Sequence, residues 1–146
     1  MKDKIIIAAM LLMTSFFMNA QKKEQVRTLP KEGSEFVATY FKDQKIKSIF
    51  KVPVDKKHKY EVTLENGIEL ELNDRGRWQE VEGNNNAVPF GYLKPATVTY
   101  IKTNYGNRKV VEVENGPRFI FVKLDNGVKL QFEAEGKFNR VVPAED

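Results

Sequence analysis

Three glutamates, Glu61, Glu69 and Glu71, come nearest in type and spacing to residues that could do chemistry. They occupy the polar positions of two neighbouring segments in which apolar and polar residues alternate, so we expect their carboxylates on one face of a sheet. Two carboxyl groups held together can act as general acid and base. Charged residues are also the usual occupants of the solvent side of such strands. The pattern therefore argues against a hydrolase, because charge at these positions is expected without any function.

Other residue types that carry catalysis or bind metals are scarce. His58 is the only histidine and stands among lysines in residues 56–59, whereas a metal site needs several converging ligands. Ser34 and Ser48 are the only serines after residue 20, and no second histidine could act as their base. Residues 73–76 lack the full spacing of a calcium loop. We therefore predict no enzyme, no cofactor and no metal site.

Aromatic and basic residues provide a second candidate surface. Phe119, Phe121 and Lys123 alternate with apolar residues expected to face the core, and Lys129 lies at an equivalent position of the following segment. Exposed aromatic side chains concentrate binding energy at protein interfaces. The alternative is that these rings pack against a second layer of the same protein. With Glu61, Glu69 and Glu71, the outer sheet face would have one acidic half and one basic, aromatic half, which could orient a partner or be an ordinary solvated face.

The elements that position these residues come from an internal repeat. Residues 60–78 match residues 120–138 at an offset of about 60, a signature of a repeated supersecondary unit. Alternating apolar residues in each copy predict strands. Asn66-Gly67 and Asn126-Gly127 separate two such runs, and both residues of Asn-Gly accept the positive φ of a type I′ hairpin turn. Each copy therefore ends in a predicted three-stranded meander.

A helix is expected upstream of each meander. Residues 36–41 carry apolar side chains on one helical face, and Ser34 is a candidate N-cap behind the chain break at Gly33. Residues 100–105 are the counterpart, preceded by Pro95, which suits a first helical turn. Their β-branched neighbours would alone favour a strand, but the repeat favours a helix.

The whole chain then divides into two helix-plus-sheet units. A further apolar strand follows each helix, at residues 46–54 and 109–113, so each unit is one helix followed by four antiparallel strands. A unit of about 55 residues is marginally stable alone, so we predict one α+β domain with the helices on one face of the sheet. The expected boundaries are 1–20 signal peptide, 21–28 flexible lead-in, 29–82 first repeat, 83–87 linker and 88–142 second repeat.

The first twenty residues have the order of a secretory signal. Lys2 and Lys4 precede an apolar run, and Ala20 is the expected cleavage position, although Met18 is larger than the residue usual two positions earlier. The run is about 13 residues, against about 20 for a membrane-spanning helix, so a retained anchor is the lesser alternative. We predict a periplasmic or secreted protein of a Gram-negative cell, without stable membrane insertion after cleavage. The net charge of +4 is spread along the chain, which argues against nucleic acid.

Several of these features together resemble a known family. They are Leu29-Pro30, the helix ending in Tyr40-Phe41, the Asn66-Gly67 hairpin, the Gly76-x-Trp78 turn and Val88-Pro89. The chain resembles the PepSY-like proteins of Bacteroidetes, which are similar in fold to the beta-lactamase inhibitory protein. The resemblance implies helices on one face of an antiparallel sheet and no reaction. Better-known relatives bind proteins, in one case inhibiting an enzyme, but no site motif can be carried over.

Two functions follow as hypotheses. The first is a non-catalytic module that contacts another envelope or secreted protein through the open sheet face, in which case Phe121 must be accessible. The second is a carrier of a small ligand. It would hold the ligand in an apolar cavity between helices and sheet near four residues, Tyr40, Phe41, Tyr100 and Tyr105.

Overall fold

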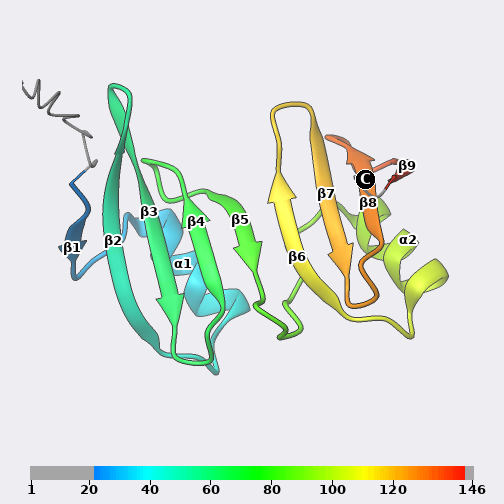
Figure 1. The fold of residues 1–146 in the computed structure, drawn as a ribbon, viewed down its shortest axis with the longest axis horizontal. Helices are drawn as coiled ribbons and strands as arrows, with labels where there is room; N and C mark the ends of the chain where they lie inside the picture. The colour runs from blue at the N-terminus through cyan, green and yellow to red at the C-terminus, as the bar shows by residue number, and fades with distance from the viewer. Residues whose placement is uncertain (1–21, 144–146) are drawn as a thin grey trace, which may run out of the picture.

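The computed structural model describes residues 22–143, which form two helices and one nine-stranded sheet (Figure 1). All neighbouring strands are antiparallel, and their order in the sheet is their order in the chain. The α+β class predicted from the sequence is confirmed. The elements are β1 (Glu24–Val26), α1 (Lys31–Tyr40), β2 (Ile46–Val54), β3 (Lys57–Leu64), β4 (Glu69–Leu72), β5 (Trp78–Glu82), α2 (Pro95–Tyr105), β6 (Val110–Asn115), β7 (Phe119–Leu124), β8 (Lys129–Glu133) and β9 (Phe138–Val142).

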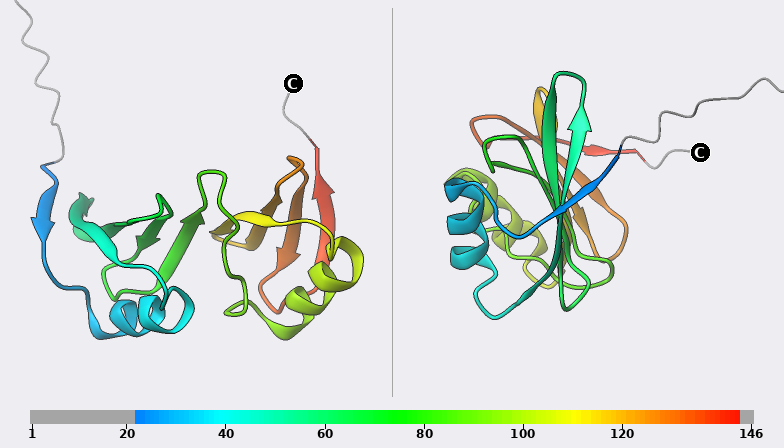
Figure 2. Two further views of the ribbon diagram at one scale, coloured as in Figure 1. Left: turned by 90° about the horizontal axis from the view of Figure 1, so that it is seen from below. Right: turned by 90° about the vertical axis from the view of Figure 1, so that its left-hand side faces the viewer.

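The two helices lie on the same side of the sheet, and the opposite side carries no helix of the described chain (Figure 2). Alternation along each strand sorts the side chains between these two sides. Val62, Leu70, Val122 and Leu130 point toward the helices and are almost completely buried. Their polar neighbours in sequence therefore point to the open side of the sheet.

The two halves of the sheet pair with the same register. Val62 lies opposite Leu70 in the first half, and Val122 lies opposite Leu130 in the second. The pairing of β4 with β5 is interrupted between Glu71 and Leu72, and the pairing of β8 with β9 is interrupted one repeat later, between Gln131 and Phe132. These irregularities bring Trp78 and Phe138 opposite Leu72 and Phe132.

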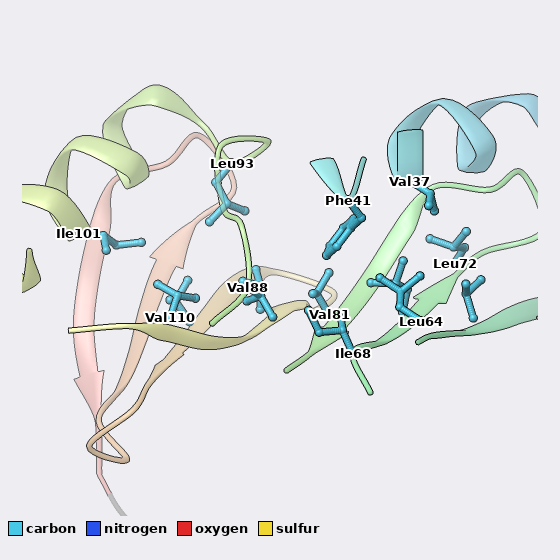
Figure 3. Packing of buried hydrophobic residues seen from close by; sticks show 14 of the residues in the cluster. Val37, Phe41, Leu64, Ile68, Leu72, Val81, Val88, Leu93, Ile101 and Val110 are labelled. Carbon is cyan, nitrogen blue, oxygen red and sulfur yellow. The ribbon is translucent and has the colours of Figure 1, made fainter. Parts of the chain in front are cut away.

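The halves join along β5 and β6, where Val81 lies opposite Val113. Both valines are fully buried, and the buried apolar side chains of the two halves form one cluster. Figure 3 shows this cluster passing from Leu64 and Ile68 through Val81 to Val88. A shared core removes the instability expected of an isolated 55-residue unit.

The hairpin turns differ from the prediction of type I′. Gly67 and Gly127 have positive φ, 91° and 85°, but Asn66 and Asn126 are not among the residues with positive φ. The backbone N–H of Gly67 donates to the carbonyl of Leu64, so the loop is a type I turn closed by a left-handed glycine. The Asn66 side chain instead accepts a hydrogen bond from the N–H of Ile68 at 3.1 Å.

Helix α1 starts earlier than predicted. It begins at Lys31, so Gly33 lies inside the helix and Ser34 is not its N-cap. The reason is tertiary packing, because a Cβ at Gly33 would lie 2.9 Å from Cδ1 of Leu72 and 3.2 Å from the carbonyl oxygen of Gly76. The glycine lets the first turn of the helix approach the β4–β5 turn, an advantage that a sequence pattern does not show.

The segment expected to be a flexible lead-in contains β1. Val26 lies opposite Ile49 of β2, and Gln25 lies opposite Phe50. Three paired residues are too few to give a periodic signal, so the strand could not be predicted from the sequence. The predicted signal peptide, residues 1–20, lies outside the described residues.

Candidate binding surface on the open face of the sheet

Two rows of side chains run across the open face, perpendicular to the strands. The first row, from β2 to β9, is Phe50, Glu61, Glu71, Glu80, Glu114, Phe121, Gln131 and Arg140. The second row, from β3 to β8, is Thr63, Glu69, Glu82, Glu112, Lys123 and Lys129. Both rows are acidic in the middle and become basic or aromatic toward β7, β8 and β9.

Seven glutamates of β3, β4, β5 and β6 make up what we call the acidic patch: Glu61, Glu69, Glu71, Glu80, Glu82, Glu112 and Glu114. Their register places carboxylates directly opposite one another in five cross-strand pairs: Glu61–Glu71, Glu69–Glu82, Glu71–Glu80, Glu80–Glu114 and Glu82–Glu112. Like charges directly opposite across strands destabilise a sheet. The acidic patch therefore lowers the stability of the folded protein, as is typical of a surface whose residues serve binding.

Lysines neutralise only the margins of the acidic patch. At one margin Lys59 Nζ lies 2.7 Å from Glu71 Oε2, and Lys23 Nζ lies 2.6 Å from Glu61 Oε2. At the other, Lys123 lies 3.6 Å from Glu112 and Lys129 lies 3.5 Å from Glu114. Within residues 22–143, Glu69, Glu80 and Glu82 in the middle of the patch form no ion pair.

The middle of the patch is electrostatically strained. Partial burial, followed by the charges of Glu71, Glu112 and Glu114, raises the pKa of Glu80 above the ordinary glutamate value. Burial and the neighbouring Glu82 likewise raise the pKa of Glu112, although Lys123 acts in the opposite direction. Both carboxylates would be stabilised by any positive charge brought to this face.

The geometry also brings three carboxylates close enough to share a cation. One oxygen each of Glu80, Glu82 and Glu112 lies within 4.8 Å of the other two. A shallow depression of about 350 Å³ opens beside them, lined in part by Glu61, Glu69 and the ring of Phe50. Hard cations prefer such carboxylate oxygens.

All seven residues predicted to bind a partner lie on the open face. Glu61, Glu69 and Glu71 belong to the acidic patch, while Phe119, Phe121, Lys123 and Lys129 lie on β7 and β8. Phe121 is half-buried, and the Lys129 ammonium lies 5.0 Å from its ring centroid, in cation–π range. The Arg118 guanidinium lies 5.6 Å from the ring of Phe119. The rings thus remain at the surface, each beside a cation.

Sequence reasoning missed the four glutamates of β5 and β6. Glu80 and Glu82 flank Val81, and Glu112 and Glu114 flank Val113, so alternation alone would have placed them on the open face. Their mutual approach had no such signal, because the pairing of β5 with β6 spans the intervening helix α2. The predicted absence of a metal site therefore overlooked the only grouping of carboxylates in residues 22–143 that could hold one.

Aromatic rings occupy the region where a ligand cavity was hypothesised. Tyr100 stacks on Phe138 with ring centroids 4.2 Å apart and planes 9° apart, and it meets Phe132 edge-on. Phe41 is 4% exposed, and Tyr40 packs on Tyr92 at 5.1 Å. These contacts occupy the space beside Tyr40, Phe41 and Tyr100 with protein side chains.

Comparison with known proteins decides the family. The sequence profile of the family "Putative beta-lactamase-inhibitor-like, PepSY-like" matches residues 19–74 and 58–140, which together span most of the chain. The chain belongs to this PepSY-like family. The resemblance inferred from the sequence is thereby confirmed. No curated protein is similar enough in sequence to count as a relative.

Three solved structures from Bacteroides are similar to this PepSY-like protein. A "putative calcium-regulated periplasmic protein" of Bacteroides thetaiotaomicron is 25% identical, with a TM-score of 0.76 over 83% of this chain and 97% of its own. A periplasmic DUF2874 protein of Bacteroides vulgatus is 27% identical, with a TM-score of 0.77 over 85% and 99%. A periplasmic protein of unknown function from the same species is 28% identical, with a TM-score of 0.75 over 84% and 100%.

The predicted periplasmic location is confirmed, since all three similar structures are described as those of periplasmic proteins of Bacteroides. Across residues 22–143, neither helix has the length and apolar character needed to cross a bilayer.

Proposed function

We propose that this PepSY-like protein is a non-catalytic binding module of the periplasm that contacts another envelope or secreted protein through the open face of its sheet. The observation that supports this most is the unneutralised middle of the acidic patch. Five like-charge pairs weaken the sheet and contribute nothing to the core, yet a cationic partner surface would relieve them. The inhibitor-like description of the family also supports a protein partner.

The face would orient its partner by charge. The acidic patch would meet a surface rich in lysine and arginine, while Phe121, Lys123 and Lys129 would meet an acidic or apolar one. Complementary potentials accelerate association and fix the relative orientation of two proteins more than they raise affinity. The partner should therefore carry a basic region next to an acidic or apolar one. Exposed charges are screened by salt, so capture should weaken as ionic strength rises.

Affinity capture tests the proposal. The chain from residue 21 onward is immobilised and exposed to envelope extract, with Glu69→Gln/Glu82→Gln as the test variant, because neither carboxylate forms an ion pair whose loss would disturb folding. Glu65→Gln/Glu135→Gln, which removes the same charge from exposed turns, is the control. A protein retained by the wild type and the control but lost from the test variant supports the proposal.

A second variant examines the other end of the face. Phe121→Ala/Lys123→Glu should also reduce capture of the same protein if both ends make contact. Where that protein is an enzyme, its activity is then assayed with one equivalent of the chain, which tests inhibition directly. Retention that is equal for every variant would contradict a role for the open face.

Calcium binding is a second candidate function, favoured by the grouping of Glu80, Glu82 and Glu112. One of the similar structures is that of a "putative calcium-regulated" protein. Three carboxylates offer up to six oxygens, and water could complete the six to eight that Ca²⁺ takes. Calorimetric titration with CaCl₂ tests this candidate: heat of binding should be present for the wild type and the Glu65→Gln control but absent for Glu82→Gln. Equal heats for all three chains would exclude these carboxylates as ligands.

The repeated register also supports an origin of the two halves as tandem copies. The family profile matches the chain twice, over residues 19–74 and 58–140. We propose the unit boundaries 29–82 and 88–142 with 83–87 as linker. Under this proposal the acidic patch is a property of the pair, because two of its five like-charge contacts cross the junction of β5 with β6 and two more lie between β4 and β5.

A further inference from the structure

The strands at the two edges of the sheet, β1 and β9, correspond in register to β5 in its middle. β5 pairs with β4 on one side and with β6 on the other. β9 pairs with β8 in the same register, Val141 opposite Leu130 where Val81 lies opposite Leu70, and among residues 22–143 it has no second neighbour. β9 thus corresponds to β5, but no strand lies beside it in the position that β6 occupies beside β5.

β1 is the complementary case at the other edge. Val26 lies opposite Ile49 of β2 as Val81 lies opposite Val113 of β6, and Ile49 and Val113 face Val62 and Val122 at matching positions. β1 therefore occupies, beside β2, the place that β5 occupies beside β6. It does so with only three residues.

The exposure of one valine shows what β9 lacks. Val81, whose strand has β6 beside it, is fully buried, whereas Val141 at the equivalent position of β9 is 48% exposed. An exposed apolar strand edge with unpaired backbone groups is a template for another strand. The strand that would cover Val141 is one that resembles β6, and the chain holds a second such strand in β2.

We propose that β9 of one molecule replaces β1 beside β2 of a second molecule, so that copies of this chain join head to tail. The exchange places Val141 opposite Ile49 and Arg140 opposite Phe50 of the partner's β2. In the single molecule Lys23, just before β1, lies 2.6 Å from Glu61, the next residue of the same row. Arg140 brings a replacement positive charge to that row, so the basic end of one molecule meets the acidic patch of the next.

In the intact chain β1 occupies the edge of β2 and so competes with β9 of a second molecule. β1 belongs to the same chain as β2, and a short tether gives an effective concentration on the order of millimolar. The intact chain is therefore monomeric at about 10 μM, and association grows as the concentration approaches that effective value. Displacement or removal of β1 opens the site. The contact is heterologous and does not close on itself, so dimers extend to longer chains.

Sedimentation velocity over a range of concentrations tests the proposal. The chain starting at residue 27, which lacks β1, should associate at least about tenfold more tightly than the chain starting at residue 21, since it no longer competes with its own strand. Val141→Lys in the shortened chain should abolish the association, because a lysine at a strand edge blocks pairing. Thr99→Lys, on the exposed side of α2, adds the same charge away from both edges and should leave it unchanged.

Disulfide trapping reports the register in the intact chain, which has no cysteine of its own. Oxidation of a concentrated mixture of Arg140→Cys and Phe50→Cys chains should give a mixed dimer, because residues opposite one another on paired strands lie within disulfide range. Arg140→Cys mixed with Thr99→Cys is the control. A monomer at every concentration with or without β1, or an Arg140→Cys homodimer in preference to the mixed dimer, would overturn the proposal.

Discussion

Substitution of Glu80 tests directly whether like-charge repulsion in the acidic patch lowers the stability of the fold. Its carboxylate lies opposite Glu71 on one neighbouring strand and opposite Glu114 on the other, and it forms no ion pair within residues 22–143. Glu80→Gln keeps the shape of the side chain and removes the charge. Each like-charge cross-strand pair costs about 0.2–1 kcal/mol. With two pairs relieved, we expect the free energy of unfolding to rise by about 1 kcal/mol.

The gain is measured by urea unfolding and calorimetry at neutral pH and low salt. For a domain of this size, about 1 kcal/mol corresponds to a Tm increase of roughly 3–6 °C. Glu65→Gln, in the exposed β3–β4 turn, removes the same charge without an opposing carboxylate and should change stability by less than about 0.5 kcal/mol. High salt should shrink the effect of Glu80→Gln, because exposed charges are screened.

The pH dependence of the free energy of unfolding tests the repulsion at Glu80 independently. Burial and neighbouring carboxylates raise the pKa of Glu80 in the folded protein above its unfolded value, so the folded state binds the proton more tightly. Stability attributable to Glu80 is therefore greatest at acidic pH and falls as pH rises from the unfolded pKa through the raised folded one. The advantage of Glu80→Gln should accordingly vanish near pH 4. An advantage that is absent at neutral pH, or independent of pH, would refute the repulsion.

Three further substitutions test the packing that supports this face. Gly33→Ala should lower the free energy of unfolding by about 1–2 kcal/mol, because overpacking against Leu72 exceeds the gain in helix propensity. Tyr92→Phe should raise it by about 1 kcal/mol, since the Tyr92 hydroxyl is buried without a hydrogen-bond partner among the described residues. Thr97→Val should lower it by about 1–3 kcal/mol, because the buried Thr97 hydroxyl donates to the carbonyl of Gly136 at 2.9 Å. Urea unfolding measures all three.

Two control substitutions at exposed helix positions show whether these changes in stability are specific to the buried sites. Glu35 lies on the exposed side of α1, and Thr99→Val repeats the Thr97 substitution at an exposed position of α2. For Glu35→Ala and Thr99→Val, the free energy of unfolding should stay within about 0.5 kcal/mol of the wild-type value. A stabilised Gly33→Ala would show that the α1 contact can relax. A destabilised Tyr92→Phe would show that the hydroxyl finds a partner.

The predictable part of this fold is local. Alternation around Val62 and Val122 identified the strands and the side of the sheet that each residue faces, because period two is imposed by the strand itself. Asn66-Gly67 identified a hairpin for the same reason. The same local reasoning misassigned the turn type and placed the start of α1 four residues too late, since the approach of Gly33 to the β4–β5 turn is set by tertiary packing.

The acidic patch depends on a strand pairing that no local sequence pattern reveals. Alternation could place Glu80 and Glu112 on the open face separately, but only the contact between β5 and β6 makes them neighbours. Because the sheet is continuous across the two halves, glutamates that are far apart in the sequence form two rows in which like charges face one another. The core and the open face therefore have one origin: Val81 and Val113 join the halves on the buried side, and on the other side the same register forces the flanking carboxylates together.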